Sequence, residues 1–154
     1  ALARTLEQWL GPFVDGLTSL AQIRRMDLQP PLDSLLTWQQ RQALPRLVPT
    51  HLTVPSGSHV KLDYEQAETP VLAVRLQEMF GCQDTPRIVG GKVSVMVHLL
   101  SPAGRPVQVT KDLASFWRSA YQEVKKELRG RYPRHHWPDD PLTAQPTNRT
   151  KRRT

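Results

Sequence analysis

The pattern of apolar and polar positions predicts helices at the start of the chain. Between residues 3 and 28, apolar side chains recur every three or four positions, which is the spacing of one helix face. Gly11-Pro12 interrupts this pattern, so we expect a kink or a break there. A second helical pattern follows Pro30-Pro31 and ends before Pro45. We therefore assign residues 1–46 to a helical segment.

The period then changes from that of a helix to that of a strand. Apolar and polar residues alternate over 51–64 on both sides of Pro55-Ser56-Gly57, which predicts a hairpin. The same alternation predicts strands over 87–89, 93–100 and 106–110. The strand 93–100 is apolar on both faces, which is typical of a central strand or of one covered by a helix.

One further helix is predicted inside this β region. The segment PVLAVRLQEMFG (70–81) begins with a proline suited to a first helical turn, and Gly81 is a plausible C-cap. Five short strands with one internal helix are typical of a small antiparallel sheet or of an OB-like barrel, here over residues 47–110. His98 lies on an apolar strand, so we expect it to be a core histidine.

A long helix closes the folded part of the chain. Asp112 is a good N-cap and Gly130 a plausible stop, so residues 111–138 contain this helix and a basic segment. Residues 139–154 have almost no apolar content, which predicts an extended or disordered tail. The expected fold class is therefore α+β. Three tryptophans are expected in the core: Trp9, Trp38 and Trp117.

Positive charge is concentrated at the carboxyl end. The chain of 154 residues has a formal net charge of +7. Residues 1–110 are nearly balanced, with ten Lys or Arg against nine Asp or Glu, whereas residues 111–154 have eleven against five. This asymmetry favours a polyanionic partner.

Phosphate groups are bound by long cationic side chains, and bases stack on flat rings. Both kinds of side chain occur together near the end of the last helix, where Arg118, Lys125 and Arg129 fall on one helix face. A solvated helix end, with Glu123 and Glu127 paired to nearby cations, is the alternative interpretation. The candidate nucleic-acid-binding residues are Arg118, Lys125, Lys126, Arg129, Arg131, Tyr132, Arg134, His136, Trp137, Lys151, Arg152 and Arg153.

No pattern in the sequence supports catalysis or metal binding. The Gly90-Gly91-Lys92 turn lacks the upstream glycine and the following Ser or Thr of a phosphate-binding loop. Cys82 is the single cysteine, so neither an internal disulfide nor a cysteine zinc site is expected, and no nearby basic residue activates it. The pair Asp139-Asp140 is a weak candidate for a cation site.

Other features set limits on the class of protein. No apolar run approaches the length of about 20 residues that crosses a bilayer, and no signal peptide is visible. We expect a soluble cytoplasmic protein. The chain begins with Ala1 inside a helical pattern, as a piece of a longer protein would.

Several long strings of residues resemble the C-terminal region of the HrpB family, bacterial ATP-dependent helicases of the DExH/DEAH-box group. They are VPSG (54–57), PVLAVRLQEMFG (70–81), HLLSPAGRPVQVT (98–110), DLASFW (112–117) and KELRGRYPRHHWPDDP (126–141). The resemblance is distinct from about Trp38 to the basic residues at the carboxyl end.

The resemblance implies an accessory role within a longer helicase. It also implies that the helical segment 1–46 is the end of a ratchet-like helical region of that protein. ATP and Mg would bind only to the motor domains of that parent protein, and no motor motif matches this chain. The expected function is therefore noncatalytic binding of RNA or single-stranded nucleic acid through a basic surface. The alternative is a protein-interaction module that docks on the motor domains or on a partner protein.

Overall fold

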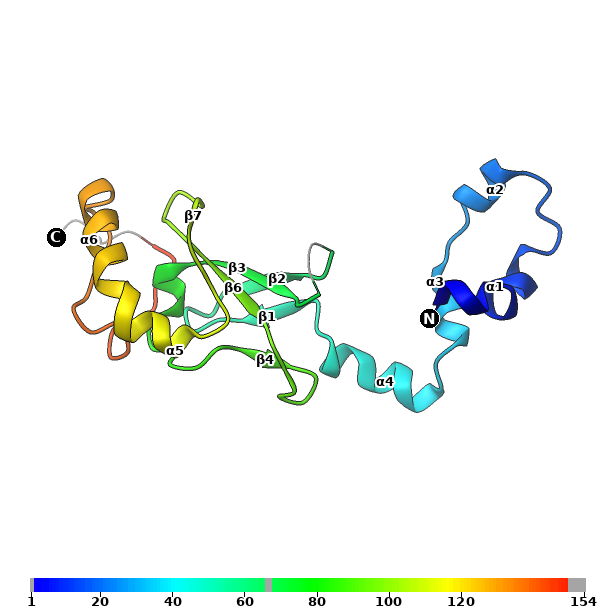
Figure 1. The fold of residues 1–154 in the computed structure, drawn as a ribbon, viewed down its shortest axis with the longest axis horizontal. Helices are drawn as coiled ribbons and strands as arrows, with labels where there is room; N and C mark the ends of the chain where they lie inside the picture. Colours follow the sequence, from blue (N-terminus) through cyan, green and yellow to red (C-terminus); the bar gives the residue numbers. More distant parts are fainter. Residues whose placement is uncertain (1, 66–67, 150–154) are drawn as a thin grey trace. The chain divides into compact units, whose positions relative to one another are not determined.

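The computed structural model describes residues 2–65 and 68–149. The chain divides into two compact units, which we call the helical unit (Ala1–Arg46) and the sheet unit (Leu47–Thr154). Figure 1 shows the elements of each unit.

The helical unit consists of short helices. They are the 3-10 helix η1 (Leu2–Thr5), α1 (Leu6–Val14), α2 (Leu20–Arg24), α3 (Gln29–Ser34) and the start of α4 (Trp38–Leu47). α1 packs against α3. Trp9 of α1 is buried, and its indole Nε1 donates a hydrogen bond to the Leu2 carbonyl at 3.0 Å. Trp9 is thus one of few buried side chains in this unit.

The positions of the helix ends differ from those predicted. α1 continues through Gly11-Pro12 and ends two residues later at Val14, so the proline lies in the last turn and removes one intrahelical hydrogen bond. The chain turns later, at Gly16, whose φ of 88° favours glycine. Ser19 and Gln22 then form a capping box that starts α2. The single predicted helix after Pro30-Pro31 is two helices, α3 and α4.

Two other predictions for this segment are wrong. Pro45 does not end α4 but lies inside it, two residues before its last residue. Trp38 is not a core residue: at the start of α4 it is 73% exposed.

The sheet unit is built on one five-stranded sheet in the order β1-β2-β3-β6-β7. Its strands are β1 (His51–Thr53), β2 (His59–Asp63), β3 (Val71–Arg75), β6 (Met96–Leu100) and β7 (Pro106–Thr110). β3 and β6 run parallel and the other neighbours antiparallel, so the sheet is mixed. The strands β4 (Arg87–Ile88) and β5 (Val93–Ser94) form a separate two-stranded hairpin.

The predicted helix over 70–81 is wrong. The segment is β3 followed by the 3-10 helix η2 (Leu76–Met79). β3 lies between β2 and β6, and its residues Leu72 and Val74 are almost completely buried. The β-branched side chains at 71 and 74 suit this position, and pairing on both sides outweighs the weak helical pattern.

The prediction of an antiparallel sheet or barrel is also only partly right. The parallel pairing of β3 with β6 was not expected, and it requires the long connection through η2 and the β4-β5 hairpin. β1 and β7 are the two edges of the described sheet, which is therefore open and not a closed barrel. β6 is a central strand, as its two apolar faces predict.

The C-terminal helix covers one face of this sheet, which we call the inner face. It comprises α5 (Leu113–Ser115), the π-helical turn η3 (Phe116–Ala120) and α6 (Tyr121–Arg131). Asp112 caps it as predicted, accepting a hydrogen bond from the Ser115 backbone N–H at 2.9 Å. Gly130 does not stop the helix, which continues to Arg131.

The core lies between the helix and the inner face. Val97 and Leu99 of β6 point into it together with Phe80, Trp117 and Tyr121. The three rings contact one another, with Trp117 and Tyr121 centroids 5.4 Å apart. Cys82 is half-buried beside this core, and burial, followed by the charge of Asp84, raises the pKa of its thiol. This agrees with an unreactive cysteine.

Two kinds of feature are absent from the described residues. None of their helices has both the length and the apolar character to pass through a membrane. Across 2–65 and 68–149, no three His, Cys, Asp or Glu side chains are grouped so that they could hold a metal ion.

The ring cluster predicts a large cost for Phe80→Ala. Phe80 is fully buried, so its truncation should lower the free energy of unfolding by about 3–5 kcal/mol. Chemical denaturation followed by tryptophan fluorescence measures this change. Val109→Ala, at a side chain that is 50% exposed, is the control and should cost less than about 0.5 kcal/mol. Equal costs for the two variants would contradict this account of the core.

Candidate nucleic-acid interface

The candidate interface is formed by α6 and the segment that follows it. The bond from the Tyr132 backbone N–H to the Leu128 carbonyl, at 2.7 Å, is the last helical hydrogen bond of α6, which ends at Arg131. Pro133 prevents its continuation. The indole Nε1 of Trp137 then donates to the Tyr132 carbonyl at 2.9 Å, which holds the returning chain against the helix end. This turn brings the returning chain next to the side of α6 that carries Tyr121, Gln122 and Lys125.

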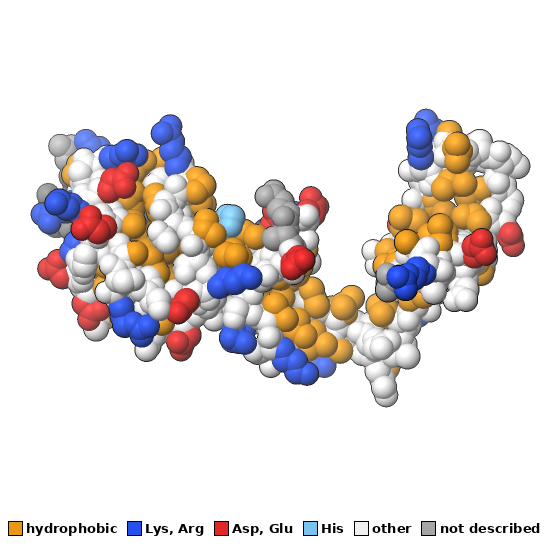
Figure 2. Space-filling model, in the orientation of Figure 1, with side chains coloured by type: hydrophobic (Ala, Val, Ile, Leu, Met, Phe, Trp, Pro, Cys, Tyr) orange, Lys and Arg blue, Asp and Glu red, His pale blue; other side chains and the backbone are white. Residues whose placement is uncertain are grey.

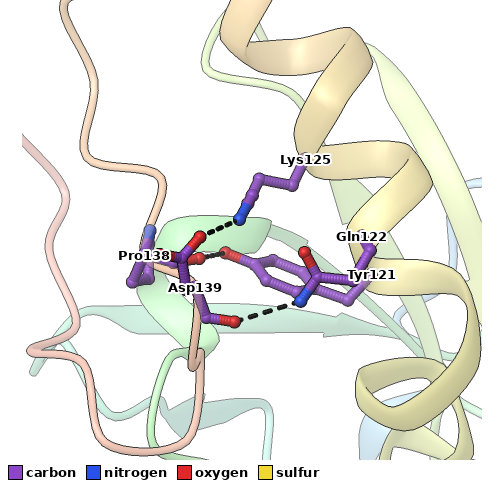
Figure 3. A network of polar contacts seen from close by, with 5 residues as sticks. All are labelled: Tyr121, Gln122, Lys125, Pro138 and Asp139. Atoms are coloured by element: carbon purple, nitrogen blue, oxygen red, sulfur yellow. Dashed lines mark hydrogen bonds and ion pairs between the residues drawn. The ribbon is translucent and has the colours of Figure 1, made fainter.

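Three side chains of α6 fasten the returning chain, as Figure 3 shows. The Tyr121 hydroxyl donates to the Pro138 carbonyl at 2.7 Å, and the Gln122 amide donates to the Asp139 carbonyl at 3.1 Å. The Lys125 ammonium donates to Asp139 Oδ1 at 2.5 Å. We call these three contacts the α6 clamp.

The α6 clamp changes the expected role of Lys125. The sequence places Lys125 on an exposed cationic stripe with Arg118 and Arg129. In the structure it is 9% exposed, and its ammonium is paired with the protein's own carboxylate. Lys125 is therefore a structural residue, and its place in the predicted stripe is a correction.

The clamp also shifts the pKa values of Asp139 and Tyr121. The hydrogen bond and the charge of Lys125, with a smaller contribution from Arg129, hold the pKa of Asp139 below its ordinary value. Burial, followed by the charges of Asp139 and Asp140, raises the pKa of Tyr121. Tyr121 therefore stays protonated and remains a donor to the Pro138 carbonyl at neutral pH.

Two further predicted cations contact the protein itself. The Arg118 guanidinium donates to Ser115 Oγ at 3.1 Å. Arg131 forms an exposed ion pair with Glu127 at 3.3 Å, one turn earlier, which is the solvated arrangement considered as the alternative. Figure 2 shows Lys and Arg side chains interspersed with Asp and Glu over this end of the sheet unit. The helix therefore does not present one continuous cationic stripe.

Three predicted cations are exposed with neither an ion pair nor a side-chain hydrogen bond among the described residues: Lys126, Arg129 and Arg134. Of the predicted rings, Tyr132, His136 and Trp137 are each half-buried. The predicted residues Lys151, Arg152 and Arg153 lie outside the described residues.

A cleft of about 510 Å³ opens where the returning chain meets α6. It is lined by Arg129, Pro133, His135, His136, Trp137, Pro138 and Asp139. A guanidinium and imidazoles beside an indole ring can contact a phosphate and a base at the same time. The cleft thus joins Arg129, His136 and Trp137, which the sequence proposed separately.

Sequence reasoning missed two residues of this site. His135 lines the cleft, and its Nδ1 is buried without a hydrogen-bond partner in the described part of the chain. Burial, followed by the charge of Arg75, lowers the pKa of His135. Asp139 was considered only as half of an acidic pair. Neither role has a spacing signal, because the turn at 132–138 creates both.

The segment beyond the α6 clamp lies along the sheet unit. The Gly81 backbone N–H donates to the Pro141 carbonyl at 2.9 Å, and the Thr147 N–H donates to the Gln77 carbonyl at 3.0 Å. Asn148 reaches Ser58 Oγ at 3.4 Å. The described part of the predicted tail therefore turns at 141–143 and is held against the sheet unit as far as Asn148.

Comparison with known proteins matches the chain to one family. Residues 9–141 match the family described as "ATP-dependent helicase C-terminal", HrpB_C. The chain is 47% identical over 152 residues to the ATP-dependent RNA helicase HrpB of Escherichia coli (strain K12). The match covers 99% of this chain and 19% of that helicase, so the chain spans about a fifth of the length of its relative.

Two solved structures are similar to the chain. The crystal structure of the E. coli DExH-box NTPase HrpB superposes with a TM-score of 0.82 at 48% identity, over 97% of this chain and 18% of that one. The crystal structure of the E. coli DEAH/RHA helicase HrpB gives a TM-score of 0.64 at 44% identity, over 88% of this chain and 17% of that one.

The α6 clamp predicts that Lys125→Met changes the titration of Asp139. A lowered pKa in the folded state means that the pair stabilises the fold above the ordinary Asp value near 3.8, and that this contribution is lost as the pH falls through the lowered folded pKa. Removing the ammonium should raise the Asp139 midpoint, measured by carboxyl ¹³C NMR. The Gly81 amide, which donates to Pro141, should also exchange faster with solvent.

Lys126→Met is the matched control, because this neighbouring lysine is exposed. It should leave both the Asp139 midpoint and the Gly81 exchange rate unchanged. An unchanged midpoint in Lys125→Met would show that the Lys125–Asp139 contact of the clamp does not form in solution.

Proposed function

The chain belongs to the HrpB family of ATP-dependent helicases, and from this premise we propose that it is a noncatalytic accessory domain that binds RNA. ATP hydrolysis is assigned to motor domains elsewhere in the longer protein, together with ATP and Mg. The RNA substrate is inferred from the name of the E. coli relative, an ATP-dependent RNA helicase. The domain itself would bind the RNA strand.

One observation carries this proposal: the cleft at the end of α6 has exposed cations beside rings. Lys126, Arg129 and Arg134 are exposed, and Arg129 lines the cleft with His136 and Trp137. Long cations suit the phosphates of a strand, and the rings suit its bases. The carboxylate that also lines the cleft, Asp139, is hydrogen-bonded to Lys125 and so is partly neutralised towards an incoming phosphate.

The proposal predicts that Arg129→Ala/Arg134→Ala weakens binding of single-stranded RNA. Removing two phosphate contacts should weaken affinity about thirtyfold at low salt, because each charged hydrogen bond contributes on the order of 1 kcal/mol. The slope of log affinity against log salt should become less steep by about 1.4. Fluorescence anisotropy of a labelled oligonucleotide at several salt concentrations measures both quantities.

Lys92→Ala/Lys111→Ala is the control, since it removes the same charge from exposed positions outside the cleft. A specific cleft predicts that this variant binds almost as tightly as the parent chain. If both double variants lost the same affinity for RNA, binding would depend on net charge and not on the cleft. Affinity that does not change with salt would remove the phosphate-binding function altogether.

A second candidate function rests on the apolar surface of the helical unit. Its described residues expose many large apolar side chains, which Figure 2 shows as orange surface. They include Leu2, Leu6, Phe13, Leu20, Ile23, Leu28, Leu35, Trp38 and Leu44. An apolar surface of this kind marks an interface with protein. We infer that this unit docks on other domains of the helicase.

Docking predicts that Leu20→Asp disrupts assembly with the rest of the helicase. Leu20 is 74% exposed, so the change should not affect folding but would bury a carboxylate in the interface. Binding of the chain to the remaining helicase domains, measured by calorimetry, should weaken at least tenfold. Leu142→Asp, at a less exposed leucine of the sheet unit, should have little effect. Unchanged affinity in Leu20→Asp would contradict docking through this surface.

A further inference from the structure

The sheet has a second face that the C-terminal helix does not cover, which we call the outer face. Along β3, Leu72 and Val74 are buried on the inner face, whereas Ala73 and Arg75 are exposed on the outer face. On β6, Val97 is fully buried and its neighbour His98 is half-buried. His98 therefore lies on the outer face, and the prediction of a core histidine is wrong.

The strand register brings cationic and imidazole side chains around one small residue. Ala73 is directly opposite His98 on β6. On the other side, Leu62 is opposite Leu72, and the antiparallel register continued by one residue places Lys61 beside Ala73. Arg75 lies two positions along β3 and so projects from the same face. Lys61, Arg75 and His98 thus surround the methyl group of Ala73.

The small side chain of Ala73 forms the floor of this arrangement, and hydrogen-bond donors stand on three sides of it. Neighbouring strands are about 4.8 Å apart, and alternate residues of a strand about 6.6 Å apart, so long side chains can converge above Ala73. Lys61 and Arg75 are exposed, and neither has a hydrogen bond or an ion pair to another described side chain. Asp63, two positions along β2 from Lys61, accepts a hydrogen bond from the Glu65 backbone N–H at 2.8 Å, and both carboxylates line a pocket with Lys61.

We propose that Lys61, Arg75 and His98 form a phosphate subsite for single-stranded RNA on the outer face of the sheet, with Ala73 as its floor. The inference rests on the proposed function and extends it, because it adds a second point of contact for the same strand. A lysine, an arginine and an imidazole donor match the negative charge and the several acceptor oxygens of a phosphodiester.

The outer face and the cleft at the end of α6 belong to the same unit. Burial, followed by the charge of Arg75, lowers the pKa of His135, which lines that cleft. The proposed subsite would therefore add a second phosphate contact to the one at the cleft.

Substitution of the floor residue tests this subsite. Ala73→Glu places a carboxylate among the three donors, whereas Ala73→Gln places a side chain of the same size without charge. Ala73 is exposed, so both variants should fold. A negative charge within about 4 Å of a phosphate should weaken binding of labelled single-stranded RNA about fivefold in Ala73→Glu relative to Ala73→Gln.

A second measurement locates the contact directly. On addition of the oligonucleotide, the Ala73 methyl and the His98 ring signals should shift in NMR spectra of the parent chain. Lys61→Ala/Arg75→Ala should weaken binding about tenfold, while Lys92→Ala/Lys111→Ala should not. Inorganic phosphate at the concentration of the oligonucleotide should cause no comparable shift, since the strand supplies several linked phosphates.

The possible results separate this subsite from the proposed function. If Arg129→Ala/Arg134→Ala loses affinity but the Glu and Gln variants at 73 bind equally, the subsite is wrong and RNA binding at the cleft remains. Equal losses in both variants at 73 would indicate a steric contact, such as a docked protein surface, and would also overturn the subsite. If the parent chain binds no RNA, both proposals fail.

Discussion

The position of α6 depends on one cluster of aromatic rings. Phe80, Phe116, Trp117 and Tyr121 contact one another between the helix and the sheet. Each buried ring contributes about 1.5–3 kcal/mol from apolar burial, so the cluster fixes the rotation of the helix about its axis. Two of the rings also hold other segments, because the Trp117 indole donates to the Cys82 carbonyl at 2.7 Å and Tyr121 to the Pro138 carbonyl. The cluster thus determines which side chains of α6 face the solvent.

This rotation explains why the cations near the carboxyl end are not equivalent. Lys125 follows Tyr121 by one helical turn, so it lies above the same edge of the core and meets the returning chain. Its neighbour Lys126 is turned about 100° away and is exposed. Because Asp139 is itself fully exposed, the pair adds little to stability by Coulombic attraction alone. Its main effect is geometric, since it fixes the wall of the cleft.

The sequence predicted the elements whose signals are local. Asp112 as N-cap, the β1-β2 hairpin and the central position of β6 follow from residues within a few positions of one another. The segment 70–81 was misjudged because its strand is defined by partners on β2 and β6 that a single stretch of sequence does not reveal. Gly130 was taken as a stop, yet a glycine in a helix costs only about 1 kcal/mol, and the helix continues.

The candidate site shows the same division. Exposed cations such as Arg129 and Arg134 could be anticipated from the charge pattern, but the loss of Lys125 to Asp139 could not, because the pair spans 14 positions across an irregular turn. The outer-face arrangement around Ala73 is likewise invisible in the sequence, since Lys61, Ala73 and His98 come from three strands joined by long connections. Register, rather than composition, brings them together.

The small number of unpaired cations has a consequence for how such a domain would act. A few phosphate contacts give weak, salt-sensitive binding without base preference when the domain is alone. Within a longer helicase, however, a strand held by the motor domains is presented at a high effective concentration, so weak contacts become sufficient. A weak grip also releases the strand quickly, which a translocating enzyme requires at every step. In this view the apolar surface of the helical unit and the cations of the sheet unit serve one purpose, because docking supplies the proximity on which the weak RNA contacts depend.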